Sequence, residues 1–292
     1  MTLSVTARSS RPFVIRRKRA GRWMATLSIF ASTLLSLAPA RGRGQTLQQE
    51  QLEQMGLAQS SAAGDWNILA GAGAVVGPAY EGATADRVRA APLFLIDYRN
   101  ELVLGPLGLA WQAIDVNGFR AGPVVGFQGG RSQSIDARLD GLGNIRTSVV
   151  AGLFANYRLG PFQLGTTVRQ SVTHSDNGLL ALVQFDYRTF LVPRRLRLIV
   201  GPEMEFANSQ YERTWFGVSS IQSVDSGLPV FTPGGGVKDV GVHAVLTYVC
   251  TEHVLVRMLA NVKELSGDLA DSPIVERRTE AVVGIAAAYH FK

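Results

Sequence analysis

The sequence has one cysteine and no apolar run long enough for a transmembrane helix. Beyond its first forty residues it has no excess of positive charge. With Cys250 as the single thiol among 292 residues, the chain forms no internal disulfide. No general base is evident beside Cys250, so we expect no nucleophilic role for it. The longest apolar run, Trp23 to Leu37, has about 15 residues, fewer than the roughly 20 of a spanning helix. Stability must therefore come from burial, backbone pairing or a bilayer.

The excess of positive charge belongs to the N-terminus. The chain has 29 Lys and Arg against 23 Asp and Glu, and seven of the basic residues precede residue 41. Without those seven, the chain has 22 basic and 23 acidic residues, which gives a net charge of minus one. No dense basic stripe remains, so we expect no nucleic-acid binding.

Residues 1–40 have the pattern of a signal peptide. A basic stretch precedes the apolar run, and Ala38-Pro39-Ala40 predicts cleavage after Ala40. A membrane anchor is the alternative, but the run is short for one. Arg16-Arg17 suggests twin-arginine export, whereas the polar residues that follow it favour ordinary secretion. Residues 41–63 are rich in Gln, Ser and Ala, and we expect a mobile periplasmic segment there.

From residue 64 onward the chain reads as strands with a period of two. The closing stretch, Val282 to Phe291, places Val283, Ile285 and Tyr289 on one face and small residues on the other. We find no strong helix pattern. The predicted strands run over 66–76, 90–98, 101–114, 119–128, 145–159, 162–172, 179–190, 195–207, 237–250, 253–265 and 277–291.

Charged residues share one face of these strands and apolar residues share the other. In a soluble sandwich the charges would face water, whereas in a membrane barrel they face the lumen and the apolar side chains face lipid. The predicted lumen charge network consists of Arg146, Arg158, Arg169, Asp186, Arg188, Arg195, Arg197, Glu203, Glu205, His243, Arg257 and Lys263.

Three features favour a membrane barrel over a soluble sandwich. The strands have about 10 to 15 residues, beyond the usual length in soluble sheets. Aromatic residues sit near segment ends, where interfacial girdles form. Short turns alternate with long ones at 129–143, 208–236 and 266–276, as in barrels with short periplasmic turns and long outer loops. We therefore predict an all-β, antiparallel outer-membrane β-barrel over residues 64–292, in contact with lipid in a Gram-negative bacterium.

The number of strands is the open point of this prediction. Eleven segments are visible, whereas a bacterial single-chain barrel has an even number. Gly105-Pro106 interrupts the segment 101–114 and could split it or mark a bulge. We predict twelve strands, with ten as the alternative.

A series of short motifs runs through the predicted barrel. They are Gly71-x-Gly73, Pro78-x-Tyr80-Glu81-Gly82, Pro92 to Tyr98, Gly130-Arg131, Leu139-x-Gly141-Leu142-Gly143, Tyr211 with Phe216-Gly217-Val218, Ser226-Gly227-Leu228 and Asp271 to Val275. In this order and spacing, the motifs resemble those of the MipA/OmpV family. The chain departs from the family pattern at Thr173 to Gly178, where a His- and Gly-rich turn is expected. Lys292 is a departure of another kind, because it follows Phe291 where a barrel would end on the aromatic residue itself. The resemblance implies a scaffold without catalytic function that contacts a lytic transglycosylase and a murein synthase.

Other functional classes stay open at this stage. Inward arginines could line a narrow channel for small solutes, or pair with acids and hold the interior rigid. Ser171, His174, Ser175 and Asp176 resemble a hydrolase cluster, but turn-forming residues explain them better. Asp268 and Asp271 suggest calcium, although turn chemistry again suffices. We expect no enzyme activity, cofactor or metal ion.

Overall fold

The computed structural model describes residues 65–106 and 108–291. The predicted signal peptide, its cleavage after Ala40, the Gln-rich segment 41–63 and Lys292 lie outside these residues. The strands are β1 (Trp66–Pro78), β2 (Asp86–Tyr98), β3 (Leu102–Gly105), β4 (Gly108–Trp111), β5 (Ile114–Val116), β6 (Phe119–Gln128), β7 (Ser148–Leu159), β8 (Phe162–Ser171), β9 (Leu179–Val192), β10 (Leu196–Ala207), β11 (Gly236–Val249), β12 (Val254–Leu265) and β13 (Thr279–Phe291).

These strands form a closed antiparallel barrel. β1 pairs with β13 from Ile68↔Phe291 to Val76↔Val283, so the closing strand lies beside the first one. β4 and β5 both pair with β6 and occupy a single position in the wall. The described strands therefore fill twelve positions, and the prediction of twelve strands is confirmed. The segment 101–114 does split at Gly105-Pro106, into β3 and β4.

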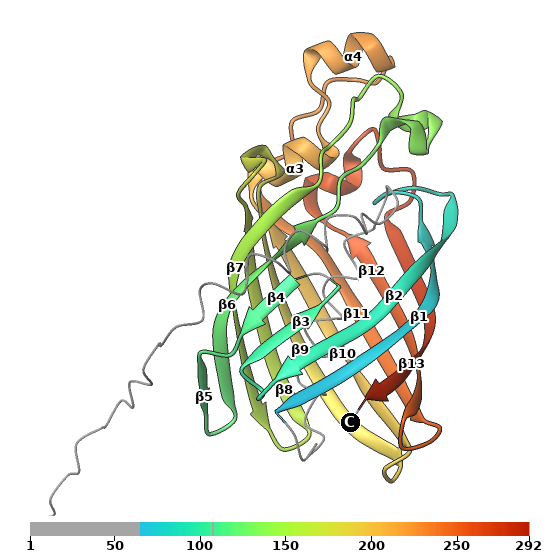
Figure 1. Cartoon of the computed structure of the whole chain (residues 1–292). Helices are drawn as coiled ribbons and strands as arrows, with labels where there is room; N and C mark the ends of the chain where they lie inside the picture. The colour runs from blue at the N-terminus through green and yellow to red at the C-terminus, as the bar shows by residue number, and fades with distance from the viewer. Residues whose placement is uncertain (1–64, 107, 292) are drawn as a thin grey trace, which may run out of the picture. The chain divides into compact units, whose positions relative to one another are not determined.

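The two ends of the barrel differ, as Figure 1 shows: helices and long loops gather at the upper end, while short turns and the C-terminal strand end lie at the lower one. Asn117-Gly118 connects β5 and β6 with positive φ at both residues, as the common two-residue hairpin requires. In barrels of this type the short turns face the periplasm and the long loops face outward.

Side chains alternate between the two faces of the wall. On β9, Val183, Phe185 and Tyr187 are exposed, whereas Gln184 and Asp186 are buried. β13 behaves as predicted from the sequence, because Val283, Ile285 and Tyr289 are exposed and Ala288 is buried. An outer surface this apolar belongs against lipid. Exposed aromatics at the lower end include Trp66, Trp111, Tyr157, Phe162, Tyr187, Tyr248, Tyr289 and Phe291.

The long loops close the upper end around a small hydrophobic core of their own. Tyr211, Trp215 and Phe216 pack there with residues of the other loops, and the Tyr211 and Trp215 rings stack with centroids 5.6 Å apart. No strong helix pattern appears among the predicted strand segments, and the loops between those segments form several short helices in this cap, because a short helix needs no long amphipathic pattern. They are α3 (Ser209–Phe216), α4 (Ser220–Ser226), η1 (Gln133–Ile135), η2 (Ala137–Leu139), η3 (Ser175–Asn177) and η4 (Gly267–Asp271).

Helix α3 illustrates how such a helix begins. The Asn208 side chain accepts a hydrogen bond from the Tyr211 backbone N–H at 2.9 Å, which satisfies one of the free donors of the first turn.

No helix among the described residues combines the length and the apolar character needed to cross a membrane.

Candidate functional site

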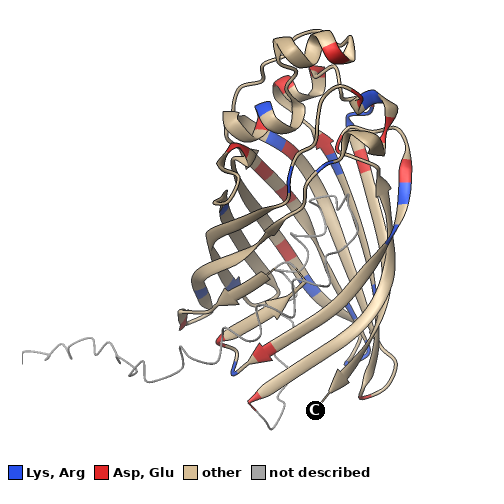
Figure 2. Cartoon of the chain, turned by 45° about the horizontal axis from the view of Figure 1, so that its top comes forward, with Lys and Arg blue, Asp and Glu red and all other residues tan. Residues whose placement is uncertain are grey.

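The interior of the barrel holds most of the predicted charge network. Figure 2 shows Lys, Arg, Asp and Glu along the strands of the wall opposite β1, which itself carries no charged residue. Ten of the twelve predicted residues lie on inward positions. Arg158 and Arg197 are half-buried. Buried are Arg169, Asp186, Arg188, Glu203, Glu205, His243, Arg257 and Lys263.

Two of the twelve predictions are wrong in position. Arg146 is exposed in the segment before β7, and Arg195 is exposed in the turn before β10. Both were assigned inward positions by extending the period of two beyond the true strand ends. The alternation holds only where the backbone is extended, so it places no side chain in a turn.

A lysine cluster lies nearest the cap. We use this name for Glu81, Glu205, Lys238, Asp239, Lys263 and Glu280. The Lys238 Nζ lies 2.8 Å from Glu81 Oε1, 2.7 Å from Glu205 Oε2 and 2.7 Å from Asp239 Oδ2. The Lys263 Nζ lies 2.9 Å from Glu81 Oε1 and 3.1 Å from Asp239 Oδ2. Each of these lysines thus bridges more than one carboxylate.

A β-bulge places Lys238 in this cluster. Glu205 pairs with Asp239 and Phe206 with Val237, so Lys238 is the extra residue of β11. The bulge turns two consecutive side chains inward, and both Lys238 and Asp239 are buried. A regular strand would have turned Lys238 toward lipid, where its charge is costly.

Glu81 ties the cap to this cluster. It lies in the loop between β1 and β2, and its carboxylate reaches Lys238 and Lys263 in the wall. Burial alone would raise the pKa of Glu81, but the two ammonium groups outweigh burial and lower that pKa from 4.5 to about 2. Glu81 is therefore ionised at neutral pH, and its loop is held by charge as well as by packing.

A second set of charges surrounds His243 on β11. The His243 Nδ1 lies 3.0 Å from Glu203 Oε2, and the His243 Nε2 lies 3.2 Å from Asp186 Oδ1. Asn261 Nδ2 donates to the other oxygen of Glu203 at 2.7 Å. Side chains from β9, β10, β11 and β12 are thereby joined across the interior, and such a network holds neighbouring strands in register.

An arginine arc lies nearer the short-turn end. It consists of Arg158 on β7, Arg188 on β9, Arg197 on β10 and Arg257 on β12. Arg188 Nη2 lies 3.1 Å from Asp186 Oδ2. Arg158 donates to Gln163 Oε1 at 3.3 Å, and Arg257 donates to Thr247 Oγ1 at 3.3 Å. The interior is thus positively charged on this side and rich in carboxylates near the cap.

The residues considered for hydrolysis do not form a triad in this geometry. Ser171 Oγ donates to Gln128 Oε1 at 2.8 Å, at the end of β8. The His174 ring contacts Thr173 Oγ1 at 3.4 Å, and Ser175 and Asp176 begin η3. These contacts are those of a turn rather than of a nucleophile oriented by a base.

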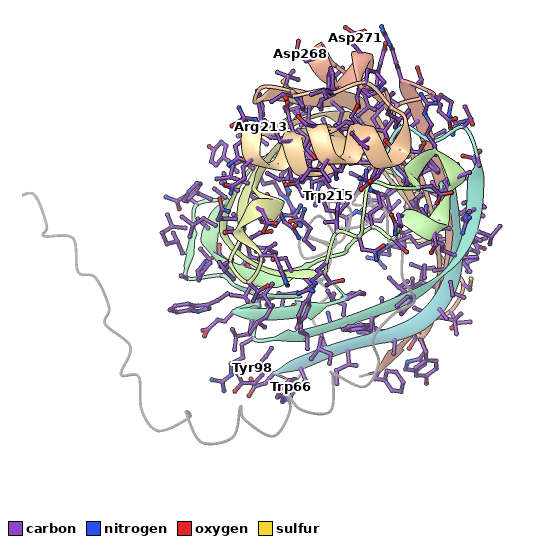
Figure 3. The ribbon with its side chains drawn as sticks, turned by 90° about the horizontal axis from the view of Figure 1, so that it is seen from above. Trp66, Tyr98, Arg213, Trp215, Asp268 and Asp271 are labelled. Carbon is purple, nitrogen blue, oxygen red and sulfur yellow. The ribbon has the colours of Figure 1, made fainter. Side chains whose placement is uncertain are left out.

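Asp268 and Asp271 lie on η4 at the upper rim, as Figure 3 shows. Asp271 forms an exposed ion pair with Arg278 at 2.7 Å. Asp268 has an electrostatic effect on Glu212. Burial raises the pKa of Glu212 from 4.5 to about 7, and the negative charge of Asp268 is the second cause of this rise. Within the described residues, no group of three or more His, Cys, Asp or Glu could hold a metal ion.

The predicted network contains two members of the lysine cluster, Glu205 and Lys263, and lacks the other four. Asp239 lies on the same face of β11 as the predicted His243. Glu81 belongs to a loop motif, and the strand patterns assign neither Lys238 nor Glu280 to the interior. The alternation on β13 could have found Glu280, which is in step with the inward Val282. Lys238 depends on a bulge, and Glu81 on a loop that folds inward, so no strand pattern identifies them.

The chain is similar to known proteins in sequence over most of the barrel. The sequence model of the family described as MltA-interacting protein MipA matches residues 70–291. A comparison with curated proteins gives no match.

The chain has a low similarity to solved structures, among them the three that follow. Pseudomonas putida OprB is 12% identical at a TM-score of 0.36, with 69% of this chain and 56% of OprB covered. The NanC porin is 8% identical at a TM-score of 0.36, with 77% of this chain and 98% of the porin covered. Salmonella typhi OmpF, solved in complex with daunomycin, is 11% identical at a TM-score of 0.35, with 78% of this chain and 97% of OmpF covered.

Family and architecture together give the location, since the chain forms a closed antiparallel barrel with an apolar outer surface. This is a β-barrel of the outer membrane of a Gram-negative bacterium, and the chain belongs to the MipA family.

Proposed function

We propose that this barrel is a non-catalytic scaffold that holds murein-hydrolysing and murein-synthesising enzymes at the outer membrane. The observation that carries the proposal is the family match over residues 70–291, because the family is described as MltA-interacting. The predicted partners are a lytic transglycosylase and a murein synthase. A shared fold does not by itself transfer a partner, so the proposal needs a direct test.

The interior supports a rigid role over conduction. The lysine cluster joins wall strands through short ion pairs, and the His243 network joins them through hydrogen bonds. The cap closes over the lysine cluster with its own buried aromatics, Tyr211 and Phe216. A barrel held in this way offers its partners a fixed surface, and we expect no discrete conductance steps from it in planar bilayers.

The partner surface that we propose is the short-turn end. Murein lies in the periplasm, and short turns face that side in barrels of this type. Charged residues stand in these turns: Arg99 forms an exposed ion pair with Asp65 at 2.9 Å, and Arg194 and Arg195 are exposed between β9 and β10. Exposed charges at a rim govern partner choice and the rate of association.

A crosslinking pull-down from cell envelopes tests the scaffold. The mature chain with an affinity tag should recover a lytic transglycosylase or a murein synthase, identified by mass spectrometry. Reversing charges in one short turn, with Arg194→Glu and Arg195→Glu, should reduce recovery at least about tenfold if that rim is the contact surface.

The matched control is Arg278→Glu, an exposed arginine at the opposite end of the barrel. It should leave recovery unchanged. Repeated recovery of no murein enzyme with the unaltered chain would contradict the scaffold proposal, and equal loss with the control would contradict the assignment of the surface.

A further inference from the structure

The arginine arc contains donor groups that the protein leaves unused. Arg188 is 7% exposed, and its Nε and Nη1 atoms are buried without a hydrogen-bond partner among the described residues. Its third nitrogen, Nη2, is the one that meets Asp186. These two buried nitrogens carry three N–H groups on a charged side chain, and their desolvation is a cost that an added acceptor would remove.

Like charges converge on the same place. Arg197 and Arg257 both pair with Thr247 of β11, so they lie at one level of the wall. Arg188 pairs with Ile199, two residues from Arg197 on β10. Arg158 pairs with Gln163 of β8, which pairs in turn with Asp186 of β9. The guanidinium of Arg197 lies over the Phe190 ring at 5.9 Å from its centroid, a contact that fixes the planar group without neutralising it. Four guanidinium groups in a low-dielectric interior repel one another, and an anion between them would turn that repulsion into attraction.

Solvent reaches one side of the arc. Arg158 and Arg197 are half-buried, whereas Arg188 and Arg257 are buried behind them. Arg158 is the penultimate residue of β7 and Arg197 the second residue of β10, so both lie close to the short turns. An anion from the periplasmic side would therefore meet Arg158 and Arg197 before Arg188 and Arg257.

From this geometry we infer that the arginine arc is a binding site for a small anion that carries two or more carboxylate groups or a phosphate. Guanidinium is the group best suited to such ligands, because its planar fork pairs with two oxygens at once. Four forks in one arc suit a ligand with several oxygens better than chloride. This inference does not depend on the proposed murein partners.

Binding can be measured on the mature, full-length chain in detergent micelles. Citrate and inorganic phosphate, each against chloride at equal ionic strength, serve as the carboxylate and phosphate probes. Saturable binding by isothermal titration, with a matching rise in the thermal unfolding temperature, is the expected result for at least one of them. The tighter probe identifies which of the two oxygen acids the site prefers.

Variants locate the binding at the arc. Arg197→Gln should weaken binding at least about tenfold, since it removes charge-assisted hydrogen bonds. Arg197→Lys keeps the charge without the fork and should retain part of the affinity, which also guards against a folding defect. Arg195→Gln, two residues away and exposed, is the matched control and should bind as the unaltered chain does.

The inference is overturned if neither probe gives saturable binding to the unaltered chain. It is equally overturned if Arg195→Gln loses as much affinity as Arg197→Gln, because the ions would then be attracted by net charge alone. Heat-modifiable mobility on gels should confirm that each variant is a folded barrel before it is titrated. Failure of the envelope pull-down would leave these outcomes unaffected.

Discussion

Replacing Lys238 with methionine tests whether the lysine cluster stabilises the barrel. Met has a similar volume, so the change removes charge and hydrogen bonds with little change in packing. Lys238 is fully buried and contacts Glu81, Glu205 and Asp239 at 2.7–2.8 Å. Without it, these carboxylates would share the interior with one fewer positive charge.

The size of the effect follows from what remains. Breaking a buried ion pair by removing one partner costs about 3–5 kcal/mol. Lys263 still neutralises Glu81 and Asp239, at 2.9 and 3.1 Å, so only Glu205 loses its nearest described lysine. We therefore expect the lower end of that range, about 3 kcal/mol of the free energy of unfolding. The double variant Lys238→Met with Glu205→Gln should recover roughly 1–2 kcal/mol.

The assay is urea unfolding in lipid vesicles, followed by tryptophan fluorescence at pH 7 and again near pH 4. Without Lys238, Glu81 takes up a proton more readily, so the loss caused by Lys238→Met should shrink at the lower pH. A loss below about 1 kcal/mol at pH 7, typical of a solvated surface pair, would refute the reasoning. So would a loss of equal size at both pH values.

Four further outcomes are expected. Ile285→Arg, at the middle of β13 on the lipid face, should cost roughly 2–4 kcal/mol in vesicle unfolding, whereas Ile285→Leu should cost little. A Cβ on Gly73 would lie 2.0 Å from the Ile285 carbonyl oxygen, so Gly73→Val should lower the heat-modifiable barrel fraction; Gly236→Ala, in open space, should not. Glu81 has a lowered pKa, so its contribution to stability is present above pH 4.5 and is lost as the pH falls toward 2; Glu81→Gln should flatten acid unfolding in that range. Glu212 has a raised pKa, so cap stability should fall as the pH rises from 4.5 to 7, and Glu212→Gln should abolish that fall in hydrogen exchange of the cap; an unchanged slope would contradict the burial of the Glu212 carboxyl group as its cause.

The interior was predictable wherever a strand was regular. Glu203 and Glu205 alternate with exposed Met204, and the structure buries both carboxylates as the pattern requires. Prediction failed at strand ends, where Arg146 and Arg195 continue the sequence pattern but the backbone turns. It also failed at the β11 bulge, since one inserted residue reverses the facing of Lys238 without changing the composition around it.

The sequence by itself determined the architecture and the location of this protein. A strand between lipid and lumen must alternate at every residue, and short turns must alternate with long loops, so both signals are local. Only the tertiary structure decided which charges meet. Glu81 reaches Lys263 across 182 positions of sequence, and four strands bring the arginine arc together. Such contacts depend on barrel closure, strand register and inward-folding loops, which are properties of the whole chain and not of any segment.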